Sequence, residues 1–131
     1  MIMANEARLW RRIKENLPKK SFAQRIETST GLGVPDVFLL LEGNLATWIE
    51  LKVTKANAVR VSASQVAWHA SYCARGGKSF YLIQGASPSD LYLFGGDQGA
   101  ELMDQGLVCG GSRFEDLASL FKALRLALLS K

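Results

Sequence analysis

The chain has 131 residues, of which 48% are hydrophobic, and a net charge of +4. A chain of this length forms one domain with a hydrophobic core, and its hydrophobic content excludes a disordered protein. The small positive charge permits binding to nucleic acids or acidic membranes without requiring it.

The few cysteines and histidines restrict the kind of metal site that the chain can form. Cys73 and Cys109 are the only cysteines and share no CxxC spacing, and His69 is the only histidine. These counts argue against a zinc site and against a multi-histidine site. Metal chemistry would therefore use oxygen ligands, which suit Mg²⁺ or Mn²⁺.

The hydropathy pattern predicts a cytoplasmic protein. The N-terminal residues lack the apolar segment of a signal peptide. The longest apolar stretch, residues 117–129, is interrupted by Lys122 and Arg125 and is too short to span a bilayer. We therefore expect both cysteines to be reduced.

Helical periodicity predicts a first helix from Asn5, which can cap it, to about Leu17, where Pro18 ends it. Its buried stripe consists of Leu9, Trp10, Ile13 and Leu17. Glu6 falls in the middle of that stripe. It is either a first-turn acid that interacts with the helix dipole or a residue of a functional site.

Two apolar runs after this helix predict a β-hairpin. A strand over residues 21–27 and a glycine-rich turn over 29–33 come first. Strands over 37–41 and 46–53 then flank a Glu-Gly-Asn turn. Alternation in the second strand places two sets of side chains on opposite faces, namely Trp48, Glu50 and Lys52 against Ile49, Leu51 and Val53.

The remaining predicted elements are a basic connection over 54–61, a helix over 62–75 that Ser62 or Ser64 can cap, strands over 78–84 and 91–94, and a final helix over 114–130. The stretch over 95–111 is glycine-rich and has no predicted element. The element order, α-β-β-β-α-β-β-α, predicts a mixed α/β domain built on a small sheet.

The hairpin brings chemically useful side chains together. Asp36 precedes the first strand and Glu50 lies late in the second, so antiparallel pairing places both carboxylates at one end of the sheet. They can share one Mg²⁺, with the carbonyl of Leu51 as a further ligand. Lys52 projects from the same face as Glu50 and can contact a scissile phosphate or an attacking water.

Both flanking helices offer supporting residues. Glu6 can complete the acidic group, directly or through water, and Gln65 can hydrogen-bond the nucleophile or a phosphate oxygen. Glu27, at the end of the preceding strand, is the alternative to Glu6, and we prefer Glu6 because its helical phase points inward. Burying Asp36, Glu50 and Lys52 together would be costly without a joint purpose.

These residues resemble the PD-(D/E)xK nuclease superfamily and, within it, the VRR-NUC (virus-type replication-repair nuclease) family. The resemblance covers about residues 5–84, and its segments are Asn5-Glu6-Ala7, Gly33-Val34-Pro35-Asp36, Ile49-Glu50-Leu51-Lys52, and Ser64-Gln65 through His69 to Gly76-Gly77. It implies an α/β, restriction endonuclease-like αβββαβ core with a mixed sheet and an added C-terminal helix.

The resemblance also implies an activity, Mg²⁺- or Mn²⁺-dependent phosphodiester hydrolysis. Asp36 and Glu50 would ligate the metal, Lys52 would be the catalytic lysine, and Glu6 and Gln65 would support the site. In this reading one nuclease domain covers 1–131, with its core over 5–84 and a C-terminal extension over 85–131. The extension matches no motif, so it either packs a dimer or selects a substrate.

Small stand-alone members of this family are similar to archaeal and phage Holliday junction resolvases, which are homodimers that cut branched DNA. The resemblance thus implies an endodeoxyribonuclease of replication, recombination or repair in a bacterial or phage-infected cell. Flap, nicked, single-stranded or RNA substrates remain alternatives, as does a non-catalytic DNA-binding module on the same fold.

Several side chains near the site in sequence have less defined roles. We expect phosphate contacts, and hence salt-dependent binding, from four basic residues, Lys55, Arg60, Arg75 and Lys78. Trp48 is expected in the core or in a dimer interface, with base stacking as the alternative. His69 is expected to be a polar helix residue near the site rather than a general base.

Overall fold

A computed structural model describes residues 4–27 and 32–130, so residues 29–31 of the predicted glycine-rich turn lie outside the described part. Within it, one sheet contains six strands in the order β1-β2-β3-β4-β5-β6. They are β1 (Phe22–Arg25), β2 (Val37–Leu41), β3 (Leu45–Val53), β4 (Ser79–Gln84), β5 (Leu91–Gly95) and β6 (Ser112–Phe114). Neighbouring strands are antiparallel except β3 and β4, which are parallel and joined through helix α2 (Ala63–Ala74).

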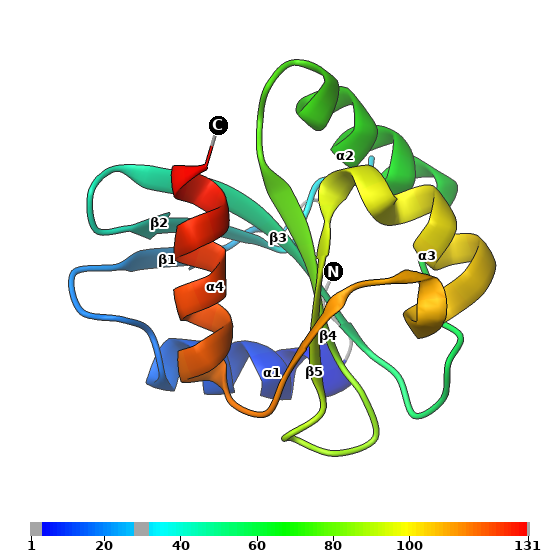
Figure 1. The fold of residues 1–131 in the computed structure, drawn as a ribbon, viewed down its shortest axis with the longest axis horizontal. Coiled ribbons are helices and arrows are strands. Elements are labelled where there is room, and N and C mark those ends of the chain that lie inside the picture. The colour runs from blue at the N-terminus through cyan, green and yellow to red at the C-terminus, as the bar shows by residue number, and fades with distance from the viewer. Residues whose placement is uncertain (1–3, 28–31, 131) are drawn as a thin grey trace.

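Helices cover the two faces of this sheet. Helices α1 (Ala4–Glu15) and α4 (Leu117–Leu129) contribute to one hydrophobic core, whereas α3 (Gly99–Gln105) contributes to a second core on the opposite face. Figure 1 shows α4 upright at the left, α1 across the bottom, and α2 and α3 together on the right. No helix in residues 4–27 and 32–130 is long and apolar enough to cross a membrane.

The alternation in β3 divides its side chains between the two faces, as the sequence predicts. Ile49 and Leu51 are buried in the core beneath α1 and α4. Glu50 lies between them in sequence and therefore points to the other face, toward α2. The mixed sheet with flanking helices and a C-terminal helix confirms the predicted fold class.

The C-terminal part differs from the prediction. The stretch 95–111 contains helix α3 between two 3₁₀ turns, η1 (Gly96–Gln98) and η2 (Gly106–Cys109). The predicted helix over 114–130 begins at Leu117, because 112–114 form an edge strand and the Asp116 side chain caps the helix by accepting from the Ser119 N–H at 2.7 Å. Periodicity missed this boundary because Phe114 packs against the same core as α4.

The N-terminal elements are also shorter than predicted. Helix α1 ends at Glu15 and not at Leu17, since Pro18 disfavours a helical conformation in the residue before it. Strand β1 covers only 22–25 of the predicted 21–27.

Candidate active site

Asp36 and Glu50 lie opposite each other at one end of the β2–β3 pair. The register pairs Val37 with Ile49, which sets Asp36, the residue before β2, against Glu50. Both side chains are buried, with 8% and 2% of their surface exposed. One carboxylate oxygen of Asp36 accepts a hydrogen bond from the N–H of Leu51 at 3.0 Å. The hairpin therefore holds two carboxyl groups together in a largely water-excluded position.

The buried Glu50 carboxyl group has too few hydrogen-bond donors and too little nearby positive charge to stabilise its ionised form. Its Oε1 atom has no hydrogen-bond partner among the described residues. Burial, and next the charge of Asp36, raise the pKa of Glu50 to about 9, although Lys52 opposes this shift with its Nζ atom 3.8 Å from Oε2. A bound cation would supply the missing positive charge, and two carboxyl groups are the oxygen donors that Mg²⁺ and Mn²⁺ prefer.

Helix α2 brings Gln65 to the same carboxyl group. Ser62 is the N-cap, and its hydroxyl accepts from the Gln65 N–H at 3.2 Å. The Oε1 atom of Gln65 accepts from the Ser62 N–H at 3.0 Å, which completes a capping box. This leaves the Gln65 amide nitrogen to donate to Glu50 Oε2, also at 3.0 Å. The helix cap thus orients the side chain that contacts the acid.

Gly33 sets the distance between this helix and the chain that leads into β2. Its φ is +81°, and an added Cβ would lie 2.1 Å from the carbonyl oxygen of Ser64. We expect Gly33→Ala to lower the free energy of unfolding by about 3 kcal/mol, from backbone strain plus displacement of the helix. Gly76→Ala is the matched control, since its φ of +90° is similar but no atom lies within 4 Å of its Cβ.

Thermal unfolding of the two variants separates these contributions. The control should lose only the strain, about 1 kcal/mol. Equal losses in both variants would mean that the contact between residue 33 and α2 is unimportant.

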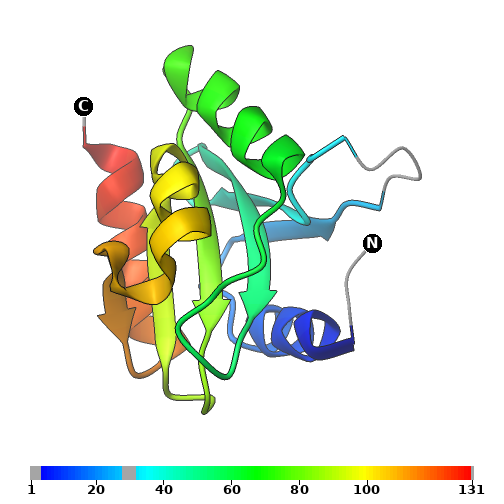
Figure 2. The ribbon, with the colours of Figure 1, turned by 90° about the vertical axis from the view of Figure 1, so that its right-hand side faces the viewer.

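Lys52 and Glu6 line one cleft of about 550 Å³ beside the carboxyl pair, together with Asn5, Thr54 and Arg60. Glu6 is half-buried near the start of α1, on the cleft wall opposite the β3–α2 connection. Figure 2 shows this start of α1, the end of β3 and the connection on the side that faces the viewer. The cleft thus brings the start of α1 and the end of β3, which carries Lys52, into one concave surface.

The other carboxylates lie elsewhere. Glu27 is exposed and forms an ion pair with Arg25. The described ranges contain no group of three histidine, cysteine or acidic side chains placed to hold a metal ion. Asp36 and Glu50 therefore form a pair, and Glu6 faces the cleft next to it.

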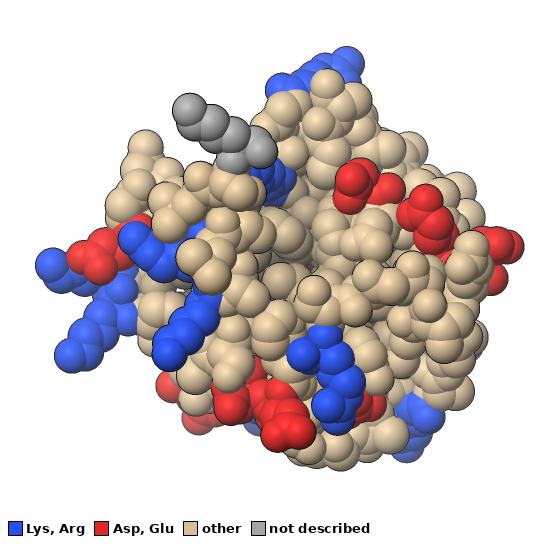
Figure 3. Space-filling model, in the orientation of Figure 1, with Lys and Arg blue, Asp and Glu red and all other residues tan. Residues whose placement is uncertain are grey.

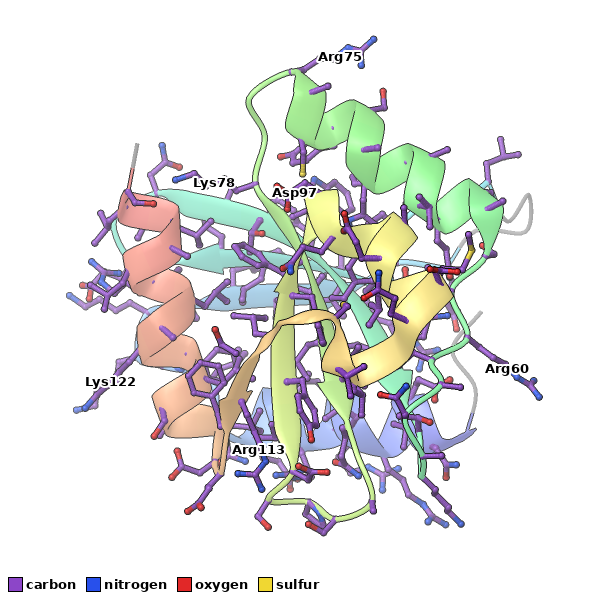
Figure 4. All side chains as sticks on the ribbon, turned by 45° about the vertical axis from the view of Figure 1, so that its right-hand side comes forward. Arg60, Arg75, Lys78, Asp97, Arg113 and Lys122 are labelled. Carbon is purple, nitrogen blue, oxygen red and sulfur yellow. The ribbon has the colours of Figure 1, made fainter. Side chains whose placement is uncertain are left out.

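The four predicted DNA-binding cations are spread over the molecule. Arg60 lines the cleft, and Lys55 is exposed on the same connection. Arg75 follows the last residue of α2, and its guanidinium donates to the Ser71 carbonyl. Figure 4 shows Arg75 at the top of the molecule and Arg60 far below it, on the connection that leads into α2. In Figure 3, acidic side chains gather around α3, where Asp97, Glu101 and Asp104 are exposed.

Lys78 has a structural contact that its sequence position did not indicate. Its Nζ atom donates to the carbonyl of Ala127 at 2.8 Å and to that of Ser130, at the C-terminal end of α4. A cation is favourable there because the last carbonyls of a helix are unpaired and carry partial negative charge. Lys78 thus fastens α4 to the sheet.

A set of polar side chains lies behind the carboxyl pair; the sequence placed His69 near the site but did not indicate its neighbours Ser79 and Tyr81. His69 is 0% exposed, its Nδ1 atom is hydrogen-bonded to the Ser79 hydroxyl at 2.6 Å, and burial lowers its pKa to about 4. Tyr81 is buried beside Glu50 on the next strand, and burial raises its pKa. Ser79 and Tyr81 alternate with Phe80 and Leu82, a pattern that signals a partly polar buried face.

No protein family model and no curated protein sequence matches the chain. Solved structures do match. A VRR_NUC domain is 16% identical with a TM-score of 0.52, over 78% of this chain and 97% of that domain. Archaeoglobus fulgidus Hjc, a Holliday junction resolvase from an archaeal hyperthermophile, is 12% identical with a TM-score of 0.52, over 91% of this chain and 93% of its own.

At these identities the likeness establishes the fold. The chain has a restriction endonuclease-like α/β fold. More specifically, it shares its fold with the VRR_NUC domain and with Hjc, as the resemblance in its sequence implied.

Proposed function

We propose that this protein is a metal-dependent endonuclease that hydrolyses DNA phosphodiester bonds and prefers branched DNA. The observation that carries the proposal is the buried pair of Asp36 and Glu50, with Lys52 and Gln65 on the Glu50 carboxyl group, in a nuclease fold. The preference for branched DNA rests on the likeness to Hjc, which is named a Holliday junction resolvase. The setting would be DNA replication, recombination or repair in the cytoplasm of a bacterial or phage-infected cell.

The side chains fit an oxygen-liganded divalent cation. Asp36 and Glu50 would hold Mg²⁺ or Mn²⁺, with the Leu51 carbonyl as a further ligand, and the unpartnered Oε1 atom of Glu50 supports this assignment. Glu6 would act through water, because it lines the cleft beside the pair. When bound, the cation would acidify a water and offset negative charge on the phosphate.

The chain's own cations and amides would position the reacting groups. Lys52 is largely buried at the cleft, so its ammonium group would contact the scissile phosphate or stabilise the attacking hydroxide. Gln65 donates to Glu50 and would keep that carboxylate oriented toward the substrate. Arg60 on the cleft wall would hold the phosphate backbone.

Cleavage assays test this proposal directly. Labelled four-way junction, flap, nicked, linear duplex and single-stranded DNA, together with RNA, are incubated with Mg²⁺, Mn²⁺ or EDTA, with Glu50→Gln and Lys52→Ala proteins run in parallel. We expect metal-dependent cutting of the junction that both substitutions remove. Cutting that survives both would disprove the assignment of the site, and binding without cutting under every condition would indicate a non-catalytic DNA-binding module.

Salt dependence distinguishes cations that hold DNA from cations that hold the fold. Arg60→Ala should weaken junction binding and reduce the slope of log K against log[salt] by about one, because one phosphate contact is lost. Lys78→Ala should leave the slope unchanged and lower the melting temperature, because Lys78 binds the end of α4. The measurement is fluorescence anisotropy at several salt concentrations with EDTA present. Equal slopes for wild type and Arg60→Ala would remove Arg60 from the DNA contact.

A homodimer is a separate proposal, supported by an aromatic row that is half-buried and ends at the exposed Phe22. This row crosses β1, β2 and β3 to reach α2, with neighbouring ring centroids 5.1–6.5 Å apart, and consists of Phe22, Phe38, Trp48, Trp68 and Tyr72. Light scattering should give a dimer mass that Phe22→Ser shifts toward the monomer, since Phe22 is 52% exposed. Leu126→Ser is the control, because Leu126 is 69% exposed on α4, and it should leave the mass unchanged. A monomeric wild type would contradict the dimer.

A further inference from the structure

One face of α2 carries three side chains that contact the sheet at successive helical turns. Gln65, His69 and Cys73 are spaced by four residues and so lie along one line of the helix. Gln65 donates to Glu50 at 3.0 Å, and His69 is hydrogen-bonded to the Ser79 hydroxyl at 2.6 Å. The Cys73 sulfur lies 3.6 Å from the same hydroxyl oxygen. The helix therefore docks through a polar row.

The sheet side of this row leads back to the active site. Tyr81 is the register partner of Glu50 on the neighbouring strand, and both side chains point toward α2. The rings of His69 and Tyr81 pack with their centroids 4.2 Å apart at an interplanar angle of 35°. An added Cβ on Gly99 would lie 2.4 Å from the Tyr81 hydroxyl oxygen, so α3 closes over the tyrosine. His69 thus contacts the residue that lies directly beside Glu50.

This polar row is a poor choice for stability alone. Glu50 Oε1, His69 Nε2 and the Tyr81 hydroxyl are buried atoms that lack a hydrogen-bond partner within the described residues. Apolar side chains of similar size would fill the same space without that cost. A locally unfavourable arrangement that adjoins a proposed active site is expected where function requires it.

We propose that His69 is a positioning residue of the active site, which holds α2 on Ser79 and Tyr81 so that Gln65 presents its amide to Glu50. The inference rests on the proposed nuclease function and extends it to a residue that touches neither substrate nor metal. The hydrogen bond at His69 Nδ1 fixes the distance of α2 from the sheet and the rotation of the helix about its axis, one turn beyond Gln65. Without this hydrogen bond, the Gln65 amide would lose its defined position, and the Glu50 carboxyl group would lose its orientation.

The test compares variants that separate positioning from stability. His69→Leu removes the hydrogen bond, and His69→Asn keeps a polar atom near the Nδ1 position. His69→Leu combined with Ser79→Ala removes both partners, so that the Ser79 hydroxyl is not left unpaired. Val66→Ala is the control, because Val66 is half-buried on the same helix and packs against the core that includes Tyr81, but its side chain can form no hydrogen bond. Each protein is measured for thermal unfolding, kcat and KM on junction DNA, and the NMR shift of the Gln65 side-chain NH₂ group.

We expect His69→Leu and the double variant to lose at least tenfold in kcat, with KM within about twofold of wild type. The double variant should recover much of the melting temperature but not kcat, and His69→Asn should keep kcat within about threefold. The Gln65 NH₂ resonance should move toward its random-coil position in both leucine variants and stay in place in Val66→Ala.

Two results would overturn the proposal. One is an unchanged Gln65 resonance in His69→Leu, and the other is a kcat that follows the melting temperature across all variants, including the control. A wild-type protein that cuts no DNA would reject the nuclease function, whereas the Gln65 resonance would still decide the positioning role, because that measurement needs neither metal nor DNA.

Discussion

Glu50→Gln is expected to abolish DNA cleavage and, at the same time, to make the protein more stable. Loss of the proposed metal-binding carboxylate should reduce cleavage by about 10³-fold or more. Stability should rise because burial and the Asp36 charge raise the pKa of Glu50 from 4.5 to about 9, so ionising this residue opposes folding. Glutamine keeps the shape and one acceptor oxygen without a charge.

The sign of the pH dependence follows from the two protonation states. The unfolded chain releases the Glu50 proton near pH 4.5 and the folded chain near pH 9, so the folded protein holds more protons between these values. Stability therefore falls as pH rises through this window. Below about pH 4.5 both states are protonated, and the stabilising effect of glutamine should disappear. At pH 8 it should be on the order of a few kcal/mol, a rise of roughly 5–10 °C in melting temperature.

Thermal unfolding in EDTA from pH 5 to pH 9 provides the measurement. Glu42→Gln is the matched control, since the Glu42 side chain is exposed and its ion pair with Lys20 lies at the surface. The control should keep full activity and the wild-type pH dependence. If wild type and Glu50→Gln lost stability in parallel between pH 5 and pH 8, Glu50 would not be the buried acid that opposes folding.

The carboxyl pair was predictable because its geometry is local. Asp36 and Glu50 belong to one hairpin, so the turn and the two-residue alternation fix both the end of the sheet and the face. Gln65 was predictable for a similar reason, since it lies in the first turn of the next helix. A short chain segment with strong periodicity thus determines most of the proposed site.

The remaining contacts depend on residues far apart in sequence, which periodicity does not encode. Lys78 follows α2 closely, yet its ammonium group binds the end of α4, 49 residues away at Ala127. The glycines of 95–111 made that stretch look irregular. Gly99 is there because a side chain at this position would collide with the Tyr81 hydroxyl. His69 looked like a polar helix residue near the site, and its bond to Ser79 appears only when α2 folds back onto β4.

Binding of Mn²⁺ to the protein without DNA is expected to tighten by about tenfold for each pH unit between pH 6 and pH 8. A carboxylate must lose its proton to ligate a metal, and the pKa of Glu50 near 9 means that this proton is still bound at neutral pH. Each Mn²⁺ should therefore release close to one proton at pH 7, which calorimetry in two buffers of different ionisation enthalpy measures.

Glu50→Gln should bind Mn²⁺ weakly and almost independently of pH, because the group that exchanges the proton is gone. A substitution of Lys52 tests the same link between the pKa of Glu50 and Mn²⁺ affinity, since the Lys52 ammonium group lies 3.8 Å from Glu50 and lowers the pKa of that acid. Lys52→Met should raise this pKa further, weaken Mn²⁺ binding at pH 7 and leave the affinity at pH 9 closer to wild type. A wild-type affinity that does not change with pH would mean that Glu50 is not a metal ligand, whatever the cleavage assays show.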